Sequence, residues 1–86
     1  MPRVCRWNGI IISLFTNEHG LPHFHASYAE FEAVIAIATL DVLESDLPRR
    51  VEAEVIGWAR TRQVELSEAW DSCQANVPPP KIAPPR

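Results

Sequence analysis

Alternating apolar and polar positions form the first hydrophobic pattern of the chain. Two alternating segments, residues 3–7 and 10–15, flank Asn8-Gly9. Asn-Gly is favoured at the centre of a two-residue hairpin turn because both residues tolerate positive φ. A turn of this length fixes the strand register, so one face should carry Trp7 and form part of the core. The residues expected to face each other are Trp7 and Ile10, Cys5 and Ile12, and Arg3 and Leu14.

A second hairpin is predicted by the alternating runs HFHASY and FEAVIAI, which follow a connector rich in turn residues. In the first run His23 and His25 share one face, because successive side chains of a strand point to opposite sides. The connecting pair is Ala-Glu, which is unfavourable in a two-residue turn. If the pair does form the turn, Glu32 lies opposite Ser27 and is a diagonal neighbour of His25.

The apolar period changes from two to about 3.6 after Asp46, and this change predicts helix. Asp46 is a candidate N-cap, and Pro48 suits the first helical turn. In one straight helix, Arg62 would lie within about 20° of the centre of the apolar stripe, so two shorter helices with a break at residues 61–63 are favoured. The apolar stripe consists of Val51, Val55, Trp58, Leu66, Ala69 and Cys73.

These elements combine into an α+β fold. The sequence predicts a small antiparallel sheet of two β-hairpins packed against one or two C-terminal helices, in a single domain over residues 1–77. Residues 38–45 form either a short further strand or an irregular link. Residues 78–86 form a proline-rich tail, which is extended because proline neither continues a helix nor donates to a sheet. Most such tails are disordered, and a minority dock along an aromatic groove of their own domain or of a partner.

Composition and charge narrow the classes of function. With 86 residues, 47% of them hydrophobic, the chain can bury one small core and no separate catalytic subdomain. The net charge is −3 and the 8 basic residues are scattered, which argues against non-specific nucleic-acid binding. Cys5 and Cys73 lack the spacing of a metal site and are predicted to be buried thiols, and no cofactor is expected. The sequence shows no signal peptide and no membrane-spanning run, so a cytoplasmic protein is expected.

The stretch NEHGLPHFHASY is the candidate site. As an acid–base pair, His23 and His25 would transfer protons near neutral pH with Glu32 orienting one ring, and would cleave RNA without a metal. As metal ligands, the two histidines would be joined by His19 in a zinc or other transition-metal site. The structural alternative places both rings on the solvent face of an edge strand, with no chemical role.

Cationic residues would complete an RNA-cleaving site. Arg6 or Arg49 would contact the phosphate. Arg50, beside Arg49, and His19 in the connector are also candidate residues for binding a partner or ligand. RNA is the possible substrate if the chain is an enzyme.

Several segments carry a family resemblance. They are the run into NGIII, the loop NEHGLPHFHASY, the strand EFEAVI, the LPRR segment and the helical WARTRQVELSEAW. Together they resemble the small bacterial domain-of-unknown-function family 4160 over roughly residues 1–77. The most specific block is PHFHA at residues 22–26, where Leu21 replaces the first of the family's two usual prolines.

The resemblance implies no settled biochemical activity, but it does imply a two-protein context. Members are typically encoded beside another small protein, often of domain-of-unknown-function family 2442, in an arrangement similar to a toxin–antitoxin pair. The first hypothesis is therefore a partner-binding component of such a pair or of a regulatory pair, with the adjacent gene product as its partner. The second is a metal-independent ribonuclease-type toxin that uses His23 and His25, and the third is the histidine metal site. No membrane partner is expected.

Overall fold

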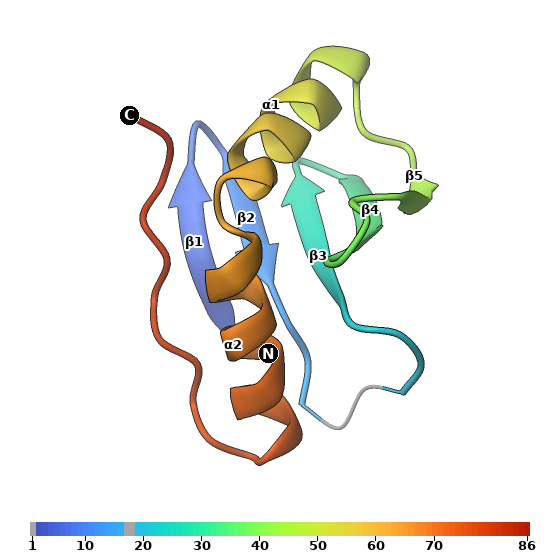
Figure 1. Cartoon of the computed structure of the whole chain (residues 1–86). Helices are drawn as coiled ribbons and strands as arrows, with labels where there is room; N and C mark the ends of the chain where they lie inside the picture. The colour runs from blue at the N-terminus through green and yellow to red at the C-terminus, as the bar shows by residue number, and fades with distance from the viewer. Residues whose placement is uncertain (1, 17–18) are drawn as a thin grey trace.

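A five-stranded antiparallel sheet occupies the first half of the chain, and two helices follow it (Figure 1). The computed structural model describes residues 2–16 and 19–86. The strand order is β1-β2-β3-β4-β5, so each strand pairs with its neighbour in sequence and the α+β prediction is confirmed. The elements are β1 (Arg3–Trp7), β2 (Ile10–Ser13), β3 (His23–Tyr28), β4 (Phe31–Ala36), β5 (Val42–Ser45), α1 (Arg49–Arg60) and α2 (Gln63–Gln74).

The β1–β2 hairpin forms around Asn8 and Gly9, which both have positive φ, at 48° and 79°. The pairing follows the predicted register from the turn as far as Cys5. Beyond that point the register shifts, and Arg3 faces Ser13 instead of the expected Leu14. The shift turns Val4 into the core, where its side chain is fully buried. The bulge therefore moves an apolar residue from the predicted polar face to the core.

The β3–β4 hairpin has the predicted register, with Ser27 opposite Glu32. Its turn contains Ala29 at a φ of 53°, a backbone conformation that is costly for a residue with a side chain. β3 lies between β2 and β4, so the alternative that placed the histidines on an edge strand was wrong about the strand. The sheet continues past this hairpin because residues 42–45 form β5, which pairs with β4.

Asp46 does not cap the first helix, contrary to the prediction. Its Oδ1 accepts a hydrogen bond of 2.7 Å from the backbone N–H of Glu32, and its own N–H donates to the Glu32 carbonyl at 3.1 Å. Pro48 occupies the N-cap position of α1, without a side-chain cap. Asp46 thus links the end of β5 to the start of β4, and its carboxylate bonds to the sheet instead of capping the helix.

The helical segment breaks where the apolar pattern predicts, at Thr61 and Arg62, between α1 and α2. The amide of Gln63, the first residue of α2, donates to the carbonyls of Ile37 and Ala38 at 2.8 and 3.0 Å. These two bonds hold the start of α2 against the end of β4. The break lets both helices bury their apolar faces while Arg62 stays half-buried outside the core.

Both helices lie on one face of the sheet (Figure 1), and the core fills the space between the helices and the sheet. The Trp58 ring of α1 lies 5.2 Å from the Trp7 ring and 6.3 Å from the Phe24 ring, measured between centroids. Cys5 and Cys73 are free and buried, as predicted, and burial raises the pKa of both thiols. Neither helix is long and apolar enough to cross a membrane.

The proline-rich tail runs in extended conformation beside β1 (Figure 1). Ile82 is buried in the core, and its N–H donates to the Val4 carbonyl at 2.7 Å. The Lys81 ammonium donates to the Arg3 carbonyl, also at 2.7 Å. The tail therefore docks on its own domain, the less common of the two outcomes considered from the sequence, and covers the outer edge of β1.

Candidate functional site

The face of the sheet opposite the helices carries two rows of aligned side chains. Strand register defines both rows, because each residue faces its partner on the next strand. Each row begins with an arginine on β1 and ends with a carboxylate on β4 or β5, and His25 occupies the middle strand. The face therefore has opposite charge at its two sides. The first row is Arg3, Ser13, His25, Val34 and Glu44, and the second is Arg6, Ile11, Ser27 and Glu32.

His23 and His25 lie side by side, as the alternation of the strand predicts. Their ring centroids are 5.2 Å apart. Each imidazole also packs against a larger ring: His25 lies 4.3 Å from Phe15 in an edge-on arrangement, and His23 lies 5.1 Å from Trp70. His23 Nδ1 is 2.9 Å from the Leu21 carbonyl, and a carbonyl only accepts, so Nδ1 carries the proton. Both rings are therefore held by aromatic packing, and His23 is also held by this hydrogen bond.

Two open depressions meet at His25 and Glu32. The larger, of about 480 Å³, lies over β4 and β5 and is lined by His25, Glu32, Glu44 and Asp46 among others. The smaller, of about 130 Å³, lies over β1 to β3, with Arg3 on its rim. The carboxylates outnumber the single arginine around His25. The local potential therefore favours a cationic group over a phosphate.

The other candidate residues are spread over the molecule. Arg6 is exposed on β1, on the same face as His25, but it is Arg3 that lines the depression. His19 is exposed in the connector, and Arg49 is exposed at the start of α1. Arg50 forms an ion pair of 2.6 Å with Glu54, one turn further along α1. None of these four residues lines either depression.

The sequence did not indicate Arg3, Ser13, Glu44 or Asp46 as site residues, although all four border His25 or Glu32. The bulge in β1 places Arg3 opposite Ser13, and the alternating pattern contains no sign of it. Glu44 and Asp46 depend on residues 42–45 forming a strand, which the sequence left open. Glu44 carries no alternation signal, because β5 reads Val-Leu-Glu-Ser and all four residues are exposed.

The third hypothesis, a metal held by histidines, requires at least three ligands at one point. Within residues 2–16 and 19–86, no group of three His, Cys, Asp or Glu side chains is placed to hold a metal ion. His23 and His25 are adjacent, and His19 is exposed in the connector that precedes them.

Comparison with known proteins identifies the family. The family model described as "Domain of unknown function (DUF4160)" matches residues 9–71. The chain belongs to this family. The searches of curated proteins and of solved structures found no match. The family-4160 match includes the histidine pair, β5 and the helix break, and it ends before the tail at residues 78–86.

Charge is segregated along this family-4160 chain. All 8 lysines and arginines lie outside residues 7–48, and 6 of the 11 acidic residues lie inside that range. Five of these six follow β3: Glu30, Glu32, Asp41, Glu44 and Asp46. The β4–β5 side of the sheet is therefore acidic and carries no cationic side chain of its own.

The two edges of the family-4160 sheet differ. The tail covers β1, as described above, whereas every residue of β5 is exposed. Two of these residues are large and apolar: Val42 is 41% exposed and Leu43 is 46% exposed. Edge strands usually carry features that discourage pairing with another chain. β5 is short and contains Glu44, but it also exposes this apolar pair, and no described segment covers it.

Proposed function

We propose that this family-4160 protein is a non-enzymatic binding module, one component of a two-protein regulatory or toxin–antitoxin-type pair, and that its partner adds a strand to β5. The observation that carries the proposal is the exposed β5 edge with its apolar pair, Val42 and Leu43. In such complexes main-chain hydrogen bonds supply affinity, and alternate side chains of the added strand supply specificity. The small protein encoded beside this one is the proposed partner.

The acidic side of the sheet defines the chemistry of the added segment. Asp41 and Asp46 flank β5, and Glu44 lies within it. A partner strand carrying lysine or arginine would bring opposite charges together, which raises the association rate and discriminates against acidic segments. We therefore propose a basic, β-forming segment of the partner as the ligand.

The same charges make binding a better proposal than RNA cleavage. A ribonuclease must hold a phosphodiester next to its acid–base pair. Around His25 the phosphate would meet Glu32, Glu44 and Asp46, and Arg3 alone would offset their repulsion. The packing of His25 against Phe15 supports a structural role for this ring.

The experiment compares two matched valine variants. Val42→Lys places a charge on β5 and should weaken binding of the adjacent gene product at least about tenfold, the level expected when a central contact is lost. Val64→Lys makes the same change on α2, where Val64 is 73% exposed, and should leave the affinity unchanged. Isothermal titration of the co-expressed and separated proteins measures the affinity, and circular dichroism checks that both variants fold.

The alternatives predict different results. Equal affinity of wild type and Val42→Lys would exclude β5 as the docking edge. Absence of any complex with the neighbouring protein, together with RNA cleavage that disappears in a His23→Ala, His25→Ala double variant, would establish the ribonuclease instead.

A further inference from the structure

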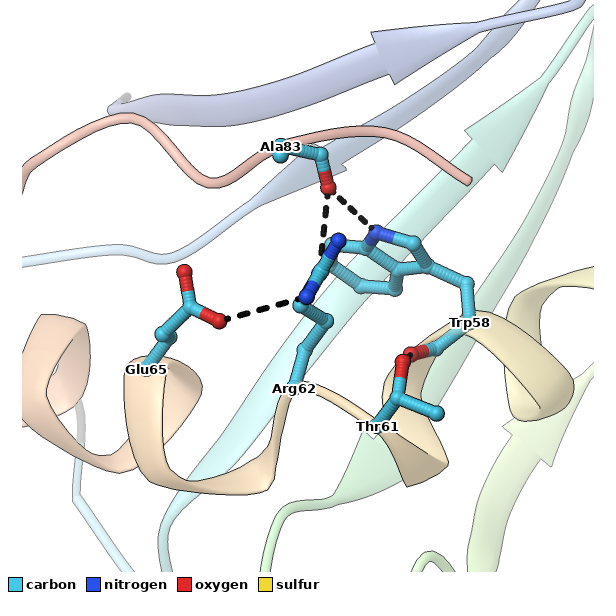
Figure 2. Close-up of polar contacts among 5 residues, drawn as sticks. All are labelled: Trp58, Thr61, Arg62, Glu65 and Ala83. Atoms are coloured by element: carbon cyan, nitrogen blue, oxygen red, sulfur yellow. Dashed lines mark hydrogen bonds and ion pairs between the residues drawn. The ribbon is translucent and has the colours of Figure 1, made fainter. Parts of the chain in front are cut away.

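A single backbone carbonyl in the tail receives two side-chain hydrogen bonds from the helical region. Trp58 Nε1 donates to the Ala83 carbonyl at 2.8 Å, and Arg62 Nε donates to the same oxygen at 3.3 Å (Figure 2). Arg62 is oriented from its other side by Glu65, whose carboxylate lies 3.6 Å from a guanidinium nitrogen. The two donors therefore converge on one acceptor from residues that the helix break brings together.

The tryptophan donor requires an acceptor at this point. Trp58 is only 3% exposed, and its ring is fixed by contacts with Trp7 and Phe24. A buried indole N–H without a partner costs free energy, and the fixed ring cannot turn to find another. The extended tail supplies the acceptor, because a polyproline-type chain forms no internal hydrogen bonds and leaves its carbonyls free.

The surroundings of this contact form an aromatic groove. The groove has a volume of about 830 Å³ and lies between the β1–β2 turn, α1 and the end of the tail. Trp7 and Trp58 line it on the protein side, and Pro84 and Pro85 of the tail line it on the other. Gly57 opens the helix surface, since no atom lies within 4 Å of the position a Cβ would take there. Aromatic-lined grooves are the usual binding sites for proline-rich segments.

We propose that this groove, the Trp58 groove, is a binding site for an extended proline-rich segment of another protein, and that the tail at residues 78–86 is its displaceable internal ligand. The tail defines the chemistry of the ligand. In the external segment, an apolar residue would take the position of Ile82 beside Val4, and a small residue would present its carbonyl where Ala83 does. A Pro-Pro pair would follow, as in the tail. The site lies at the β1 edge, opposite β5, and does not depend on the function proposed above.

The internal ligand has a large advantage over an external one. Only residues 75–80 separate the end of α2 from Lys81, which is the first tail residue bonded to β1. A short connection of this kind gives the tail an effective concentration in the millimolar range. An external peptide therefore binds the wild-type chain weakly, and its apparent affinity rises with the fraction of molecules in which the tail is detached.

The test uses the full chain and a fluorescently labelled peptide with the tail sequence PPPKIAPPR, with anisotropy as the readout. Ile82→Asp places a charge at a buried position and detaches the tail. This variant should bind the peptide at least about tenfold more tightly than wild type. Adding Trp58→Phe, which keeps an aromatic ring but removes the N–H donor, should abolish the gain. A peptide with aspartate in place of its isoleucine is the matched control and should not bind.

Three results would overturn the proposal. The first is a folded Ile82→Asp chain that binds the peptide no better than wild type. The second is a gain in affinity that persists in the presence of Trp58→Phe. If Ile82→Asp does not fold, the wild-type chain is titrated with millimolar peptide and the Trp58 indole N–H resonance is followed by NMR. An unchanged resonance is the third.

Discussion

The substitution Ile82→Ala, which shortens one side chain of the tail, tests whether the tail is part of the folded domain. Ile82 is 4% exposed, although it lies in a segment whose composition is typical of disordered chain ends. Removing a fully buried isoleucine side chain to alanine costs about 2–5 kcal/mol in free energy of unfolding. The lower half of this range is expected, because a terminal segment relaxes around the cavity more easily than the centre of a sheet. A loss of about 2–3 kcal/mol corresponds to a fall in Tm of about 8–24 °C for a chain of this size.

Urea denaturation followed by tryptophan fluorescence measures the loss and also identifies its mechanism. If the tail with the shortened side chain stays docked over a cavity, the urea midpoint falls and the slope m stays constant. If the tail detaches, m falls as well, because the native state already exposes the surface that the tail covered. Val77→Ala is the control: Val77 is 52% exposed, and its loss should change the free energy by less than about 0.5 kcal/mol. Identical curves for Ile82→Ala and Val77→Ala would refute the docking of the tail.

The remaining predictions concern the turns and the thiols. Ala29→Gly should stabilise the protein by about 0.5–1 kcal/mol, because glycine removes the cost of positive φ. Gly9→Ala should destabilise it by at least about 1 kcal/mol, since Gly9 has a φ of 79° and an added Cβ would lie 3.4 Å from the Tyr28 ring. Thermal melts check both, and a Tm that falls in Ala29→Gly would contradict the first. Burial raises the pKa of Cys5 and Cys73, so the folded chain holds these protons more tightly than the unfolded chain. The free energy of unfolding should therefore fall as pH rises above the ordinary thiol pKa of 9.0. Alkylation of the native thiols by iodoacetamide should be slow, because both are buried. Rapid alkylation at pH 8 would contradict the burial.

Local chemistry made part of this fold predictable. Asn8-Gly9 set a hairpin whose first three pairs have the expected register, since the turn type leaves no other choice. The position of Arg62 in the apolar stripe predicted the helix break, because burying a guanidinium in the core would have been too costly. The shared face of His23 and His25 followed from strand alternation alone.

Features that depend on distant contacts were not predictable in this way. The bulge at Val4 buries an apolar side chain, and this burial stabilises the fold only when the tail and the helices cover the side chain. Aspartate is a favoured helix-cap residue, but the carboxylate of Asp46 accepts a hydrogen bond from the backbone N–H of Glu32, 14 residues away in sequence. Three of the four charged residues that border the candidate site depend on such distant arrangements: Arg3, Glu44 and Asp46.

The tail also bears on where a partner strand can be added. Proline has no backbone N–H, and the tail contains five prolines among residues 78–86. A tail of this composition satisfies carbonyls of β1, through Ile82 and Lys81, but offers few donors to a further strand on its outer side. Pairing therefore ends at the tail, whereas β5 has no such covering among the described residues. If the partner binds by strand addition, it binds at one edge only, so the complex should contain one partner strand for each chain.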